Sequence, residues 1–257
     1  MKFAICMYGQ PRDYKYGYGL ISEFMKINNE HTYDFFFHAW INDNIVFDCS
    51  PWRQINPESL YIKNQNEVKN EILELYKPIL YEFEKPLDKN NTDISIDLLN
   101  IKDSLVYKNM CQRNKDNIFN TLSQMYSRNK VKDLLQNIIT KLDKNYDMVI
   151  STRFDGFNFP KKIKLNNIQK NKIYVSSLYH PPRFILPDNF LLIPIDIYLN
   201  WFNLYHNIKN IINNTDLENK MNNINETHAF NAEEILLSNY LYCGYSMNDI
   251  IFSSELN

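Results

Sequence analysis

The chain has 257 residues, a formal net charge of −2 and 44% hydrophobic residues. A chain of this length buries roughly three quarters of its unfolded surface, so one large domain can fold without disulfides. The nearly neutral charge and the lack of any Lys and Arg run argue against a nucleic-acid partner.

The cysteines and the amino-terminal residues indicate where the protein works. The cysteines are far apart and show neither a Cys-x-x-Cys pair nor the spacing of a zinc site: Cys6, Cys49, Cys111 and Cys243. Reduced thiols of this kind predict a cytoplasmic location. The apolar run after Met1 breaks at Gly9, which is too short for a signal peptide or a membrane span. We expect no transmembrane segment, and peripheral association with the inner face of a membrane stays open.

The first element predicted is a buried strand over Lys2–Tyr8, followed by the loop Gly9, Gln10, Pro11 and Arg12. A helix over about Tyr18–Ile27 comes next, with apolar residues at helical spacing. Free backbone N–H groups and a helix start favour a nucleotide phosphate at such a junction. The alternative for Arg12 is an ion pair with a nearby carboxylate.

A second buried strand is predicted over Tyr33–Phe37, and it ends in His38, Ala39 and Trp40. His38 is either a site residue or a structural histidine with its hydrogen bonds satisfied. Trp40 is either a stacking surface or a residue on the rim of the site.

The middle of the chain predicts peripheral structure. The predictions are an irregular segment over Asp43–Pro57, a helix over Asn64–Leu75, a strand over Pro78–Phe83 and an exposed loop over Asp88–Asp97.

The most regular helix is predicted over Phe119–Leu142. Lys130 lies on its apolar stripe, so its ammonium needs an anion or a route to water. The anion is a phosphate in the functional interpretation, and snorkelling along the stripe is the alternative. Gln124 and Ser127 lie on the adjacent face and can add hydrogen bonds.

The segment around which the chain is organised is Tyr146–Phe157, where the apolar run Met148–Ile150 predicts a strand buried on both faces. Gly156 allows a sharp turn directly after it. Arg153 and Asp155 are thereby left at the carboxyl end of the strand, which is where ligands bind in open α/β sheets.

The last third of the chain predicts two more strands and two helices. A strand over Lys172–Leu178 precedes a rigid turn at His180–Arg183, and Asp188 precedes the apolar run Leu191–Ile193. Asp188 is either a catalytic carboxylate or a turn residue. Asp196 is predicted to cap a helix that runs through Trp201, Leu204 and Tyr205.

A final helix is predicted over Asn231–Tyr242. Asn231 and Glu234 have the spacing of a capping box. Alternatively, Glu233 or Glu234 is a general base or accepts hydrogen bonds from sugar hydroxyls.

Taken in order, these motifs resemble a family of bacterial glycosyltransferases that build capsules and surface polysaccharides on a GT-A fold. They run from Phe3 to about Tyr245: Gly-Gln-Pro-Arg, Phe-Phe-Phe-His-Ala-Trp, Ser-Gln-Met-Tyr-Ser, Arg-Phe-Asp, Pro-Asp-Asn-Phe and Asn-Ala-Glu-Glu-Ile-Leu-Leu. The resemblance implies one α/β domain over residues 1–257, with a mostly parallel central sheet flanked by helices and a helical insertion.

The resemblance also implies a reaction, in which a sugar passes from a UDP- or GDP-linked donor to a carbohydrate acceptor. The donor-binding residues would be Gly9, Gln10, Pro11, Arg12, His38, Trp40, Gln124, Ser127, Lys130, Arg153 and Asp155. The catalytic carboxylate would be Asp188, Glu233 or Glu234. The Asp-x-Asp metal site of the family falls on Arg153-Phe154-Asp155, so Mn²⁺ or Mg²⁺ would be held by Asp155, with phosphates and water completing its shell. The alternative is a transferase that stabilises the leaving diphosphate with Arg and Lys in place of a metal.

Two other functions stay open. One is a nucleotide-sugar-binding subunit of a polysaccharide assembly complex that has lost catalysis, which the replacement of the first aspartate by Arg153 favours. The other is a nucleotide-sugar phosphotransferase, which releases a nucleoside monophosphate.

Overall fold

The computed structural model describes residues 1–42, 64–104, 118–156, 159–160, 162–176, 186–224 and 231–252. The predicted irregular segment Asp43–Pro57 and the predicted turn His180–Arg183 lie outside these ranges.

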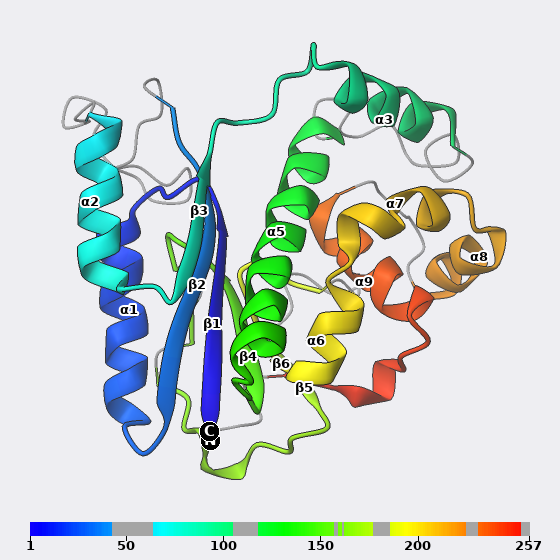
Figure 1. The fold of residues 1–257 in the computed structure, drawn as a ribbon. Helices are drawn as coiled ribbons and strands as arrows, with labels where there is room; N and C mark the ends of the chain where they lie inside the picture. The colour runs from blue at the N-terminus through cyan, green and yellow to red at the C-terminus, as the bar shows by residue number, and fades with distance from the viewer. Residues whose placement is uncertain are drawn as a thin grey trace, which may run out of the picture.

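The described residues form a seven-stranded sheet with the order β3-β2-β1-β4-β6-β5-β7 (Figure 1). The strands are β1 (Lys2–Gly9), β2 (Thr32–Trp40), β3 (Leu80–Glu84), β4 (Met148–Arg153), β5 (Ile173–Val175), β6 (Phe190–Pro194) and β7 (Ile250–Phe252). All adjacent pairs are parallel except the two that β6 makes with β4 and β5. The mostly parallel α/β sheet that the sequence predicted is confirmed.

Helices cover both faces of the sheet (Figure 1). Alternate residues of β1 enter different cores: Phe3, Ile5 and Met7 pack with α1 (Tyr14–Ile27) and α2 (Gln65–Tyr76), while Ala4, Cys6 and Tyr8 pack with α5 (Ile118–Leu142). This two-sided burial explains the unbroken apolar sequence of β1.

The remaining helices lie on the α5 side of the sheet (Figure 1). They are α3 (Thr92–Asp103), α6 (Ile195–Trp201), α7 (Leu204–Ile212), α8 (Thr215–Ile224) and α9 (Ala232–Tyr242), with short 3₁₀ turns at Leu165–Asn167 and Met247–Asp249. Within the described ranges, no helix is long and apolar enough to cross a membrane.

Three local predictions need correction. The predicted loop over Asp88–Asp97 is wrong in its second half, because Asn91 accepts a hydrogen bond from the Asp93 amide and α3 starts there. The helix predicted from Asp196 is wrong at both ends. α6 follows Pro194 directly, so Asp196 lies in its first turn and is not an N-cap, and α6 ends at Trp201, so Leu204 and Tyr205 belong to the separate helix α7. The first helix begins at Tyr14, four residues before the prediction, because its first turn lacks the apolar spacing used to find it.

The strand order turns back at β1. The chain proceeds from β1 outward to β2 and β3, and α5 then carries it back to β4 on the other side of β1. Loops that leave β1 and β4 therefore diverge, which opens a crevice at the carboxyl ends of these strands.

Candidate functional site

A pocket of about 430 Å³ lies at this crevice. The residues that line it come from the ends of β1, β2 and β4, from α5 and from the start of α9: Tyr8, Gly9, Gln10, Arg12, Trp40, Asn120, Thr121, Ser123, Gln124, Arg153, Asp188, Ala232 and Glu233. The sequence-predicted site residues among them are Gly9, Gln10, Arg12, Trp40, Gln124, Arg153, Asp188 and Glu233. Residues up to 225 positions apart in sequence thus meet at the edge of the sheet where the ends of the predicted strands indicated a site.

The turn after β1 forms one wall of the pocket. Gly9 has a φ of 93°, a conformation that glycine adopts without steric cost. The Arg12 amide donates to the Gln10 carbonyl at 2.8 Å, which closes the turn, and Pro11 is buried behind it. The Gly9 amide donates to Ser127 Oγ at 2.9 Å, so α5 anchors the turn.

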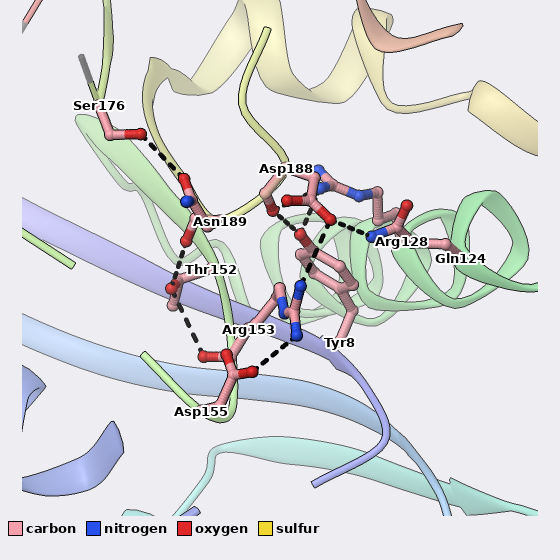
Figure 2. A network of polar contacts seen from close by, with 9 residues as sticks. All are labelled: Tyr8, Gln124, Arg128, Thr152, Arg153, Asp155, Ser176, Asp188 and Asn189. Atoms are coloured by element: carbon pink, nitrogen blue, oxygen red, sulfur yellow. Dashed lines mark hydrogen bonds and ion pairs between the residues drawn. The ribbon is translucent and has the colours of Figure 1, made fainter. Parts of the chain in front are cut away.

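The opposite wall is the loop that carries Asp188, and it is held by both backbone and side-chain contacts (Figure 2). Arg128 Nη2 donates to the Asp188 carbonyl oxygen at 2.7 Å, and the Tyr8 hydroxyl donates to the same oxygen. Gln124 Nε2 donates to Asp188 Oδ2 at 2.7 Å, and Arg153 Nη1 lies 3.7 Å from it. The Asp188 carboxylate is therefore already engaged by two donors.

The neighbouring residue is fixed in the same way. The Asn189 carbonyl accepts from Thr152 Oγ1 at 2.8 Å, and Asn189 Oδ1 accepts from Ser176 Oγ at 2.9 Å (Figure 2). The loop is thereby joined to both β4 and β5.

Arg153, the last residue of β4, lies between the carboxylates of Asp155 and Asp188. Its Nη2 donates to Asp155 Oδ2 at 2.6 Å, and the Asp155 side chain is 4% exposed. Although burial opposes the charged form, the carboxylates of Asp155 and Asp188 raise the pKa of Arg153. Arg153 therefore stays charged at the pocket wall.

The described residues do not fit a metal ion that Asp155 would hold. Its carboxylate lies in the ion pair with Arg153 and outside the pocket lining. In the described ranges, no three His, Cys, Asp or Glu side chains are grouped so that they could hold a metal. A divalent cation at Asp155 would have to displace the guanidinium, so we derive no step from one.

The two carboxylates at the start of α9 have different surroundings. Glu234 is fully buried, and its amide donates to Asn231 Oδ1 at 2.8 Å, which confirms the predicted capping interaction. Glu233 lines the pocket. Burial, assisted by the charge of Asp188, raises the pKa of Glu233 to about 7. A carboxylate with a pKa near 7 is suited to accept a proton at neutral pH.

Three predicted site residues lie beneath the pocket, outside its lining. His38 is fully buried and Ser127 is too, with His38 Nδ1 and Ser127 Oγ 2.8 Å apart. Lys130 has carboxylate partners at Glu84, 2.7 Å away, and Glu82, 3.2 Å away. The anion that Lys130 requires is therefore supplied by β3.

Trp40 lines the pocket but offers it little surface. It is 3% exposed, and its ring stacks on Tyr126 with the ring centroids 5.5 Å apart. A base would have to displace Tyr126 to stack on that face.

Sequence reasoning missed two central residues, Tyr8 and Arg128. Arg128 is 1% exposed, and its guanidinium lies 3.9 Å from the centre of the Tyr8 ring. Its signal in the sequence was an arginine at helical spacing from the apolar residues Met125, Val131 and Leu135 of α5. Tyr8 ends an apolar strand and carried no signal.

No family model matches this chain, and no curated protein or solved structure matches it significantly. Its function must therefore be inferred from the chemistry of the pocket.

Two chemical capacities meet there. Arg12 and Arg153 line one pocket together and are suited to phosphate oxygens, because guanidinium groups bind them in a bidentate manner. Glu233 adds a carboxylate whose raised pKa fits proton transfer. Together they suit a reaction in which a phosphate leaves and a hydroxyl loses its proton.

Proposed function

We propose that the chain is a GT-A-like glycosyltransferase that moves a sugar from a UDP- or GDP-linked donor to a carbohydrate acceptor in surface-polysaccharide synthesis in the cytoplasm. The observation that supports the proposal is the pocket at the β1 and β4 ends, whose lining includes Arg12, Arg153 and Glu233. The motif resemblance supports the same reaction and supplies the acceptor class.

Arg12 and Arg153 bind the diphosphate in this proposal. Charge develops on the diphosphate as it leaves, and cations placed in the pocket before the reaction stabilise that charge. Arg153 is held by Asp155 at 2.6 Å, so it is oriented before the donor arrives.

Glu233 is the general base. The acceptor oxygen forms a bond to the anomeric carbon, the bond from that carbon to the diphosphate oxygen breaks, and the electron pair leaves with the diphosphate. The hydroxyl proton passes to Glu233. Asp188 is less suited to this role, because Gln124 and Arg153 already occupy its carboxylate. It orients Arg153 instead.

The donor is identified by thermal shift with a panel of UDP- and GDP-sugars. A ligand present at 100 times its dissociation constant stabilises the protein by about 2.7 kcal/mol. Products formed with the stabilising donor then define the reaction. A nucleoside diphosphate indicates sugar transfer, a monophosphate indicates phosphotransfer, and binding without any product indicates a binding subunit.

Arg12→Ala tests the diphosphate site. Loss of a charged phosphate contact weakens donor binding by ~1.5–3 kcal/mol. Lys15→Ala is the control, because Lys15 lies three residues away on α1, is exposed and pairs with Glu71 at 3.0 Å. Equal donor affinity in the two variants would refute the assignment of Arg12.

A further inference from the structure

A chain of polar contacts runs beneath the pocket from β3 to the turn after β1. The Gly9 amide lies 2.9 Å from Ser127 Oγ, and Ser127 Oγ lies 2.8 Å from His38 Nδ1. His38 Nε2 lies 3.4 Å from Glu84 Oε2. The helix α5, which carries Ser127, packs against both β1 and β2 (Figure 1). We refer to Glu84, His38, Ser127 and Gly9 as the polar chain.

The chemistry of each group and the distances between them favour one direction for these hydrogen bonds. A backbone amide can only donate, so Ser127 Oγ accepts from Gly9. The Ser127 hydroxyl then donates to His38 Nδ1, since its other acceptor, the His38 carbonyl, is farther away at 3.5 Å. His38 Nδ1 is therefore unprotonated, and the neutral ring carries its proton on Nε2, facing Glu84.

The far end of the polar chain is anchored. Lys130 Nζ lies 2.7 Å from Glu84 Oε1, and both residues belong to elements, α5 and β3, that contact β2, the strand of His38. Burial lowers the pKa of His38 to about 4, so the ring is neutral near pH 7 and keeps the tautomer described above.

A serine, a histidine and a glutamate in series also suggest a nucleophile with its base. Two observations argue against this role for Ser127. The side chain is completely buried, and its oxygen already accepts the Gly9 amide proton. A nucleophile must reach substrate, so the series holds structure in place and performs no chemistry.

We propose that His38 is a positioning residue that acts through Ser127 to fix the Gly9 amide, and with it the turn from Gly9 to Arg12 at the pocket wall. His38 accepts a hydrogen bond from the Ser127 hydroxyl, so Ser127 Oγ can accept the hydrogen bond from the Gly9 amide. The inference that this turn binds the donor rests on the proposed function. The inference that His38 and Ser127 fix the Gly9 amide is independent of it.

Exchange of the Gly9 amide hydrogen, measured by NMR without ligand, tests the proposal. Ser127→Ala and His38→Leu are expected to speed this exchange about three- to tenfold, the range for loss of one hydrogen bond. His38→Asn is expected to restore slow exchange, because its side-chain carbonyl can accept from Ser127. Ser151→Ala is the control, since Ser151 is buried and its hydroxyl has no hydrogen-bond partner among the described residues.

The ring itself gives a second measurement that needs no variant. Nitrogen chemical shifts of His38 in the wild type are expected to show a proton on Nε2 and none on Nδ1 at pH 7. A proton on Nδ1, or equal exchange in Ser127→Ala and Ser151→Ala, would overturn the proposal. If the wild type binds no nucleotide, the proposed function fails while the exchange result stands.

Discussion

Replacing Glu233 by glutamine should stabilise the protein at alkaline pH. The pKa of Glu233 is raised from 4.5 to about 7, so the folded protein holds a proton that the unfolded chain releases. Stability linked to this group is complete below about pH 4.5 and is lost as the pH rises through 7. The difference corresponds to roughly 3 kcal/mol at full ionisation. Glutamine has the same shape and no charge, so it removes this loss.

Urea unfolding of both proteins at several pH values measures the effect. We expect Glu233→Gln to unfold with the wild-type free energy at pH 4 and to be about 1–3 kcal/mol more stable at pH 8.5. Other groups that titrate over this range are common to both proteins, so their contributions cancel in the difference. Glu74→Gln is the control for replacing a glutamate by glutamine at the surface, because Glu74 is exposed on α2.

The same variant should lose catalysis while it gains stability. A general base contributes roughly 10²–10⁴-fold to turnover, and donor affinity should remain, since glutamine cannot accept the proton but occupies the same space. A stability difference that is constant from pH 4 to 8.5 would refute the raised pKa. Full turnover in Glu233→Gln would refute its role as the base.

Three further predictions follow from close packing and from charge. Gly17→Ala should destabilise the protein by at least about 2 kcal/mol in urea unfolding, because the new Cβ would lie 1.8 Å from the Phe154 carbonyl oxygen. Gly19→Ala on the same helix is the control: its Cβ would meet no atom within 4 Å, so this variant should be more stable by about 0.5–1 kcal/mol. Asp155→Asn should abolish transfer because it releases Arg153, and wild-type transfer should persist in EDTA; loss of activity in EDTA with recovery on Mn²⁺ would instead support a metal. The stability that neutral His38 contributes is present above about pH 6.5, and up to roughly 3 kcal/mol of it should be lost as the pH falls to 4. In His38→Asn, the free energy of unfolding should therefore fall less steeply over this pH range.

The inner strands of the sheet were predictable because they are buried on both faces. A strand covered by helices on each side consists of consecutive apolar residues, and this pattern located β1, β2 and β4 within a few residues. Since parallel strands present their carboxyl ends at one edge, the polar residue after each strand marked the pocket. Gly9, Arg12 and Arg153 were found in this way.

The partners of the charged residues were not predictable from the pattern. Lys130 was correctly expected to need an anion, but Glu82 and Glu84 lie almost 50 positions earlier in the chain. Which strand lies beside α5 depends on the order of the sheet, and the spacing of residues within one element carries no such information. The short helix α8 was missed, and the start of α7 was joined to α6, for a related reason: about ten residues contain too few turns to establish a period.

The choice between Glu233 and Glu234 was, by contrast, already contained in the capping box. In that motif the third helical residue turns its side chain back toward the N-cap, and Asn231 Nδ2 indeed lies 3.5 Å from Glu234 Oε1. Successive residues of an α-helix point about 100° apart, so a neighbour of the capping glutamate must face another direction. With Glu234 turned into the protein, Glu233 is the carboxylate that can face the pocket. The structural interpretation of the motif therefore indicates which of the two carboxylates lines the pocket.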